Sequence, residues 1–292
     1  MMKKATELSA TSQGFETLEE IVSIHRLRLN GHRQPFIVLP GIYPPDEWSL
    51  LTIQAAQTAL DLRPDIDLVL DLGCGSGVIP LVLARINPNR DLRFVCCDIK
   101  SISSRNLDLN FQMFGDMAKR PRFHCLDISG EGTREVMDGA PALVIANVPQ
   151  LPVSVALSDA DPDDYHPVTA RDREDPVRAF GLGLLLDIGR QVAAANPAGP
   201  CLAFCRSSRI PQSIFDAFLD RIGDKVCHQG PRISVRDGST PFDLLAEAEE
   251  RFGVSGTYEW AGRTVSATEL RGRRPAETEV FIGLQSCLIQ LV

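Results

Sequence analysis

Residues 67–77 read DLVLDLGCGSG, and this stretch decides the fold. A short apolar run reaches Asp71, glycines follow at positions 73, 75 and 77, and an apolar pattern with helical spacing begins at Val78. Glycines let bare backbone approach a ligand, and the N-terminus of the following helix adds N–H donors and a positive dipole end. We therefore interpret the stretch as a ligand-binding strand, loop and helix. A tight turn without a ligand is the alternative.

Short apolar runs alternate with longer helical patterns on the C-terminal side of this loop, which is typical of a parallel sheet with crossover helices. The strand-like runs are DLVLDL, LRFVCCD, RFHCLD, ALVIANV and PCLAFCR, and helices are expected over 78–86, 104–114, 181–195 and 211–222. The final run, EVFIGLQSCLIQL, is expected to close the sheet as an antiparallel edge strand. The pattern predicts an α/β fold with a doubly wound, mostly parallel sheet.

The first 60 residues are expected to form an N-terminal extension, and residues 61–292 the main domain with an insertion near 237–276. Asn30-Gly31 between two partly alternating runs predicts a hairpin over 25–38. After two prolines, the run over 46–62 has helical spacing with Asp46 as its cap. A further helix is expected over 241–252 with Thr240 as its cap.

The composition excludes several classes of protein. The 292 residues carry a net charge of −8, the wrong sign for neutralising many phosphates, so a nucleic-acid partner is not expected. Neither a membrane span of ~20 apolar residues nor a secretory leader is indicated, which predicts a cytoplasmic protein without a membrane partner. Eight cysteines without a CxxC pair are interpreted as reduced core thiols. The five histidines lack metal-ligand spacing, so no metal is expected. The sequence does not indicate an oligomeric state.

Charge near the loop indicates what the ligand carries. The glycine spacing is GxGxG rather than the dinucleotide pattern GxGxxG, and Asp71 lies two residues ahead of the first glycine. A carboxylate there would repel a pyrophosphate and attract an ammonium group. The second strand ends in Asp98, about 20 residues beyond the loop, where nucleotide-binding folds place a carboxylate on ribose hydroxyls. A nucleoside with a positively charged tail fits both positions.

Over residues 36–290, the chain resembles the class I S-adenosylmethionine-dependent methyltransferases, which have a Rossmann-like fold with a seven-stranded sheet. The resemblance implies that S-adenosylmethionine is the cofactor. It also implies that Asp98 holds the ribose, that Ile99 packs on the adenine, and that Asp127 lies beside the adenine amino group. A solvated acid at a strand end is the alternative for Asp127. The implied ligands of the methionine part are Asp71, Gly73, Cys74, Gly75, Ser76 and Gly77.

The stretch ALVIANVPQLP, residues 142–152, resembles the NPPY motif of enzymes that methylate planar nitrogens. Two flanking stretches, VLPGIYPPDEWSLL and REDPVRAFGLGLLLDI, resemble segments of the HemK-like branch, which methylates glutamine. Hydrogen bonds from the N–H groups of a planar nitrogen to oxygen acceptors would strengthen as the nitrogen gains positive charge in the transition state, and this accelerates the reaction. The candidates are the Asn147 side chain and a main-chain carbonyl near Val148 and Pro149. A local cap at a strand-end turn is the alternative for Asn147.

The motif also departs from the family pattern. Val148 stands in place of the first proline and Gln150 in place of the aromatic residue. Without that aromatic residue a flat base has lost its stacking platform, so a nucleobase substrate is not favoured.

Acidic residues between 159 and 175 would attract a cation if this segment overhangs the pocket; a solvated loop is the alternative. A protonated guanidinium needs a carboxylate to hold it and to accept a proton, and Glu174 and Asp175 are the candidates, with His166 as another possible base. A basic cluster near the C-terminus could bind a substrate carboxylate. The alternative is that its arginines are ordinary surface charges. This cluster consists of Arg263, Arg271, Arg273 and Arg274.

Together these features predict an enzyme, an N-methyltransferase acting on a guanidino or amide nitrogen of a small, cationic molecule such as arginine. Two alternatives stay open. One is methylation of a protein glutamine or a ribosomal RNA base. The other is a scaffold that binds S-adenosylmethionine without catalysis.

Overall fold

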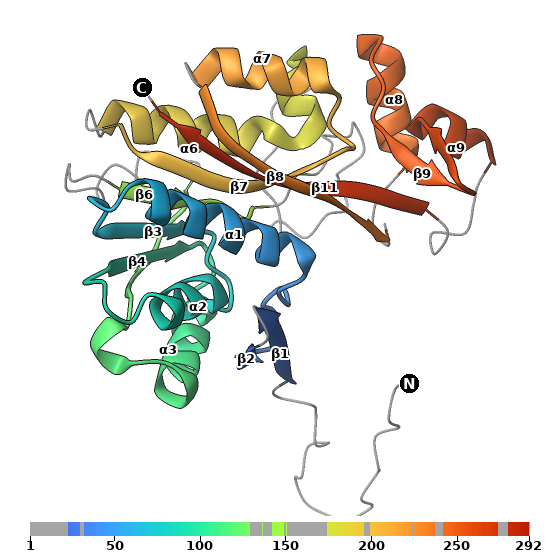
Figure 1. The fold of residues 1–292 in the computed structure, drawn as a ribbon. Coiled ribbons are helices and arrows are strands. Elements are labelled where there is room, and N and C mark those ends of the chain that lie inside the picture. The colour runs from blue at the N-terminus through green and yellow to red at the C-terminus, as the bar shows by residue number, and fades with distance from the viewer. Residues whose placement is uncertain are drawn as a thin grey trace, which may run out of the picture.

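The computed structural model describes residues 23–29, 32–128, 136, 142–148, 150, 174–195, 199–222, 225–236, 242–273 and 280–291. Five parallel strands form one side of a nine-stranded sheet, in the order β5-β4-β3-β6-β7 with β5 at the edge (Figure 1). They are β3 (Leu68–Leu72), β4 (Arg93–Asp98), β5 (Arg122–Cys125), β6 (Ala142–Ile145) and β7 (Cys201–Ser207). The predicted parallel strands are confirmed. The order along the sheet reverses at β3, and ligands of open α/β sheets bind at such a point.

The remaining strands extend the sheet in antiparallel fashion beyond β7. The final strand, β11 (Val280–Gln290), pairs antiparallel with β7, as expected. It is not an edge, because β8 (Lys225–Arg236) pairs along it and β9 (Tyr258–Trp260) pairs with its first residues. β9 in turn pairs with β10 (Arg263–Val265). Among the described residues the sheet therefore has nine strands rather than the expected seven.

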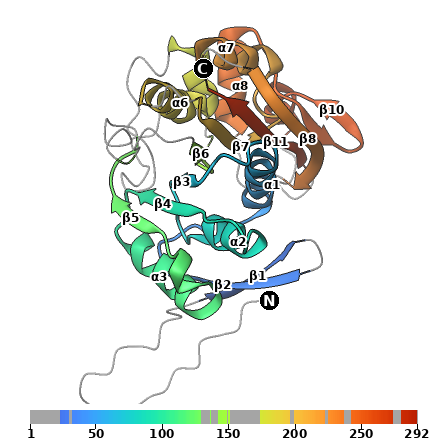
Figure 2. The ribbon, with the colours of Figure 1, turned by 60° about the vertical axis from the view of Figure 1, so that its left-hand side comes forward.

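Helices cover both faces of the sheet, which confirms the doubly wound fold (Figures 1 and 2). One face carries α1 (Glu47–Leu62), α2 (Val78–Ile86) and α3 (Ile102–Phe114), and the other carries α6 (Gly183–Ala195) and α7 (Gln212–Ile222). Successive residues of β7 alternate between two apolar cores, as the pleat requires: Phe204 belongs to one and Ala203 to the other. Within the described part of the chain, no helix combines the length and apolarity needed to cross a membrane.

The N-terminal hairpin consists of β1 (Ser23–Leu29) and β2 (His32–Val38), paired antiparallel as predicted, while the turn residues 30–31 lie outside the described residues. The helix after it begins where expected. The Asp46 carboxylate accepts hydrogen bonds from the backbone N–H groups of Trp48 and Ser49, at 3.0 and 3.3 Å. This helix, α1, packs against β7 and β11 rather than on the hairpin, although the sequence assigns most of it to the N-terminal extension.

A helical turn before α6 and a small unit beside β11 complete the architecture. A π-helical turn over Arg178–Leu182, with Gly181 at φ +85°, leads into α6. Near the start of β11, α8 (Phe242–Phe252), the β9-β10 hairpin and α9 (Ala267–Arg273) gather into a small unit (Figure 1). The buried Glu249 carboxylate ties this unit together, because it accepts hydrogen bonds from the backbone of Gly256, Ala267 and Thr268. The predicted cap, Thr240, lies outside the described residues.

Candidate functional site

The glycine loop needs glycine for two separate reasons. Gly73, Gly75 and Gly77 all adopt positive φ angles, of +77°, +50° and +71°, which other residues rarely adopt. Neighbouring side chains also leave little room. A Cβ atom on Gly77 would lie 2.8 Å from Leu107 Cδ1, and one on Gly73 would lie 3.2 Å from Val148 Cγ1. The second contact means that the loop and the segment after β6 touch.

Hydrogen bonds to the end of β4 fix the course of this loop. The N–H groups of Gly73 and Cys74 both donate to the carbonyl oxygen of Cys97, at 2.8 and 3.0 Å. The N–H of Gly75 donates to Asp98 Oδ2 at 2.8 Å, and that of Lys100 donates to Asp98 Oδ1 at 2.9 Å. Since a carboxylate has about four lone-pair sites, Asp98 retains acceptor capacity for a ligand hydroxyl.

Asp71 is the buried charge of the site. Its side chain is 1% exposed, and within the described structure neither carboxylate oxygen has a hydrogen-bond partner. Burial, with a smaller contribution from the nearby charge of Asp98, raises its pKa to about 8. A buried, unpartnered carboxylate costs several kcal/mol unless a cation or donor compensates it. The residues around the loop therefore fit a ligand whose ammonium group reaches Asp71 directly or through a water molecule.

The positions predicted to face the adenine meet at two adjacent strand ends. β4 and β5 run parallel with Asp98 opposite Cys125, and the N–H of Leu126 donates to the Asp98 carbonyl at 3.1 Å. Ile99 follows Asp98 directly and is 60% exposed, so its apolar side chain is accessible to a ligand. Asp127 is exposed next to the end of β5.

The segment after β6 presents two polar side chains held in place by other elements. Asn147 is half-buried, and its Nδ2 donates to Ser49 Oγ at 3.0 Å, while its Oδ1 accepts a hydrogen bond from Thr52 Oγ1 at 3.3 Å. Gln150 is buried, and its Nε2 donates to the Cys205 carbonyl at 2.5 Å. Its Oε1 is left without a partner among the described residues. Pro149 lies outside them.

Two residues near this segment were missed by the sequence interpretation. Trp48 is half-buried on the first turn of α1, next to the Ser49 that binds Asn147. The guanidinium of Arg209 lies 5.3 Å from its ring centroid, and Arg209 Nε donates to Ser207 Oγ at 3.1 Å. Trp48 lies within VLPGIYPPDEWSLL, a stretch that the family resemblance pointed to without giving any of its residues a role.

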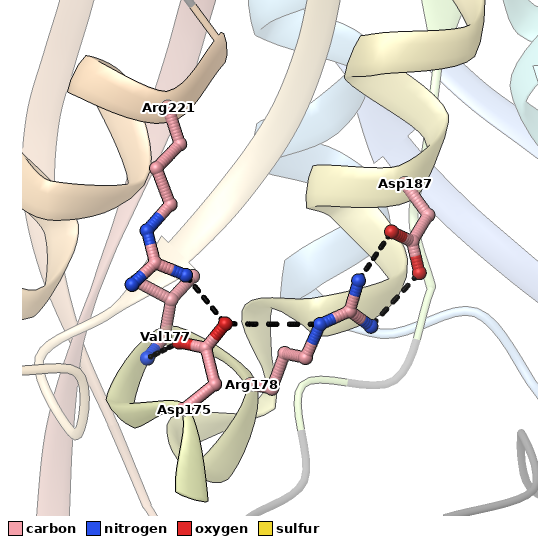
Figure 3. A network of polar contacts seen from close by, with 5 residues as sticks. All are labelled: Asp175, Val177, Arg178, Asp187 and Arg221. Atoms are coloured by element: carbon pink, nitrogen blue, oxygen red, sulfur yellow. Dashed lines mark hydrogen bonds and ion pairs between the residues drawn. The ribbon is translucent and has the colours of Figure 1, made fainter. Parts of the chain in front are cut away.

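Asp175 is held by two arginine side chains. Its Oδ2 binds Arg221 Nη1 of α7 at 2.5 Å and lies 3.8 Å from Arg178 Nε (Figure 3). Arg178 also binds Asp187 of α6 through two hydrogen bonds, of 2.9 and 2.5 Å (Figure 3). This network joins helices on one face of the sheet, whereas the partners of Asn147 belong to α1 on the other.

Both carboxylate oxygens of Asp175 have partners. Oδ2 contacts the two arginines, and Oδ1 caps the following turn by accepting a hydrogen bond from the Val177 N–H at 3.0 Å. Its role as a base stays a prediction. Glu174, the other predicted base, is exposed.

Of the remaining predicted residues, the described ones lie on β10 and α9. Arg263 is exposed on β10, and Arg271 pairs with Glu250 of α8. His166, Arg274 and residues 159–173 lie outside the described part of the chain, as does the side chain of Arg273. In that described part, no group of three His, Cys, Asp or Glu side chains could hold a metal ion.

No protein-family model matches this chain, and neither does any curated protein. Solved structures resemble it in fold. The complex of aTrm5 with tRNALeu has a TM-score of 0.50 at 10% identity, over 95% of this chain and 55% of that one. A 16S rRNA methyltransferase from T. thermophilus, in complex with AdoMet and guanosine, has a TM-score of 0.44 at 16% identity, over 92% of this chain and 51% of its own.

A precorrin-6y C5,15-methyltransferase from Geobacter metallireducens has a TM-score of 0.44 at 11% identity, over 86% of this chain and 93% of its own. The chain thus spans about half the length of the 16S rRNA methyltransferase and of aTrm5. At identities this low the likeness extends to the fold, which is the Rossmann-like fold of methyltransferases.

Proposed function

We propose that the protein is an S-adenosylmethionine-dependent N-methyltransferase that acts on a planar amide or guanidino nitrogen of a small substrate, in the cytoplasm. One observation carries the proposal. The glycine loop touches the segment after β6, since a Cβ on Gly73 would lie 3.2 Å from Val148 Cγ1. A ligand bound on the loop would therefore lie beside Asn147, the residue next to Val148.

Residues of the loop supply what this cofactor needs. The buried Asp71 carboxylate would balance the ammonium group of its methionine part, and Asp98 would accept the ribose hydroxyls. The exposed Ile99 would pack on the adenine. When bound, S-adenosylmethionine supplies a methyl group on a sulfonium sulfur; a correctly placed lone pair would attack the methyl carbon in line as the carbon–sulfur bond breaks.

The protein's part in the reaction is then to position the substrate nitrogen. Ser49 and Thr52 of α1 hold the Asn147 amide, and Asn147 Oδ1 keeps a lone pair for a substrate N–H. A hydrogen bond to that N–H strengthens as the nitrogen gains positive charge during transfer, which lowers the barrier. Gln150 Oε1, a buried acceptor without a partner among the described residues, can receive a second N–H of an amide or of a neutral guanidino group.

A nucleobase is the second candidate substrate, and Trp48 favours it. Trp48 directly precedes Ser49, which binds Asn147, so an aromatic side chain lies near the site. It could take the place of the aromatic residue that the motif lacks at Gln150. The net charge of −8 opposes a long polyanion, which is why we rank this candidate second.

A methyl-transfer assay tests the proposal. Folded protein is incubated with methyl-labelled S-adenosylmethionine and, separately, with arginine and other guanidino compounds, a glutamine-containing peptide, and total RNA. We expect label on a guanidino or amide compound, and its loss in Asn147→Ala. Asn87→Ala, which alters a buried asparagine at the opposite end of α2 from the loop, is the matched control and should retain transfer. Label on RNA alone would favour the second candidate. Binding without transfer to any acceptor would instead favour a scaffold.

A further inference from the structure

Helix α3 carries two asparagines that its amphipathic pattern does not explain. Asn106 and Asn110 are four residues apart, so they lie on the same face of the helix, and both are 0% exposed. Asparagine is a poor residue for a helix interior, and a buried amide costs free energy unless its hydrogen bonds are made. Two such residues side by side therefore need a structural partner.

One partner is the backbone at the end of strand β2 and in the residue just after it. The N–H of Ile37 donates to Asn110 Oδ1 at 2.6 Å, and the N–H of Leu39 donates to Asn106 Oδ1 at 2.7 Å. In return, both side-chain amides donate to the Ile37 carbonyl, at 2.8 and 3.0 Å. The two amides thus bind the backbone of β2 much as a neighbouring strand would.

The other partner is the glycine loop. Both side-chain amides also donate to the carbonyl oxygen of Ser76, Asn106 at 3.1 Å and Asn110 at 2.8 Å. Ser76 lies between Gly75 and Gly77, which have no side chain to restrain them. Each amide nitrogen has two hydrogens, so both asparagines are fully engaged between β2 and the loop.

We propose that Asn106 and Asn110 are positioning residues for the cofactor, and that the N-terminal hairpin acts through them as part of the cofactor site. β2 orients the two amides, the amides fix the Ser76 carbonyl, and this fixes the peptide groups on either side of it. Glycine loses more conformational freedom on ordering than any other residue. A loop ordered in advance therefore binds its ligand at a lower entropic cost. The inference rests on the proposed binding of S-adenosylmethionine.

The test variant is Asn110→Asp, which keeps the size of the side chain and an acceptor for the Ile37 N–H but removes the amide that donates to both carbonyls. Its carboxyl group would face the carbonyl oxygens of Ile37 and Ser76 and has at most one proton to offer them. Asn87→Asp is the matched control, because Asn87 is also buried and its amide also donates to a backbone carbonyl, that of Leu83, at 2.9 Å. Asn87 follows the last residue of α2, away from the loop.

Two readouts are compared at pH 8: the dissociation constant for S-adenosylmethionine, and hydrogen exchange of the backbone amides of residues 73–77 without ligand. We expect Asn110→Asp to weaken binding at least tenfold and to speed exchange in the loop beyond any change in global stability. The control should change both by less than twofold. If Asn110→Asp does not fold, Asn106→Ala, which removes one of the two donors to Ser76, is expected to act in the same direction.

The two proposals fail separately. Unchanged loop exchange in the folded variants overturns the positioning role, whether or not the cofactor binds. Faster loop exchange with unchanged affinity overturns the link between loop order and binding. If the wild type binds no S-adenosylmethionine, the cofactor role is overturned with the proposed function, even if the exchange data support the structural clamp.

Discussion

Replacing Asp71 with asparagine is expected to stabilise the ligand-free protein. The Asp71 side chain is 1% exposed, and within the described residues neither carboxylate oxygen has a hydrogen-bond partner. Burial, with a smaller contribution from the charge of Asp98, raises its pKa from 3.8 to about 8. At neutral pH the folded state must therefore hold a proton that the unfolded chain releases.

The sign and size of the effect follow from this difference. Because the folded pKa lies above the unfolded value, the contribution of Asp71 to stability is highest below pH 3.8 and falls as the pH rises toward 8. The loss is at most about 1.4 kcal/mol per pH unit in this window. Asparagine does not titrate, so the stability gain of Asp71→Asn should grow with pH, reach about 2 to 4 kcal/mol at pH 7, and level off above pH 8.

Urea unfolding of both proteins at pH 5, 6, 7 and 8 measures this gain. Asp91→Asn is the control, since Asp91 is exposed, and its effect should stay within about 0.5 kcal/mol at every pH. The same Asp71→Asn variant should bind S-adenosylmethionine at least tenfold more weakly, because the carboxylate that balances the ammonium group is gone. A stability difference that does not vary between pH 5 and pH 8 would refute the buried, unpartnered carboxylate.

Three further predictions address the rest of the site. Asn147→Ala should lower kcat about a hundredfold or more, because it removes an acceptor that acts in the transition state. The dissociation constant for the cofactor should stay within twofold of the wild-type value. A kcat equal to that of the wild type would rule out this role for Asn147. Gly77→Ala should abolish cofactor binding in calorimetry, because its Cβ would lie 2.8 Å from Leu107, while Gly253→Ala, with a similar φ of +65° and open space, should only lower the melting temperature. Asp175→Asn should lower the free energy of unfolding by about 1 to 3 kcal/mol, because it breaks the ion pairs with two arginines, and it should leave kcat unchanged. A large fall in kcat would instead support Asp175 as a base.

Local signals made the glycine loop and the parallel strands predictable. Each strand is a run of apolar residues bounded by loops, and the positive φ angles of the loop leave few residues besides glycine. Helix α2 begins and ends where the sequence predicts, at Val78 and Ile86. Asp98 could be proposed from the sequence because nucleotide-binding folds place a carboxylate about 20 residues beyond the glycine loop, at the end of the next strand.

Features that depend on contacts between distant segments could not be predicted from the sequence. β8 contains Gly230-Pro231, which reads as a turn, and its strand exists because β11 offers it a partner. Asp175 reads as part of an acidic loop, and only the fold brings Arg221 of α7 against it. Asn106 and Asn110 read as the polar face of a helix, because nothing local reveals that β2 and the loop lie there.

Equilibrium binding of S-adenosylmethionine to the folded wild-type chain, measured beside Asp98→Ala, tests the central claim most directly. We predict one site per chain, with a dissociation constant on the order of 1–100 μM, the range typical of enzyme ligands, and binding weakened at least tenfold in the variant. No binding by the wild type at concentrations up to about 1 mM, the upper end of the usual range, would contradict the account.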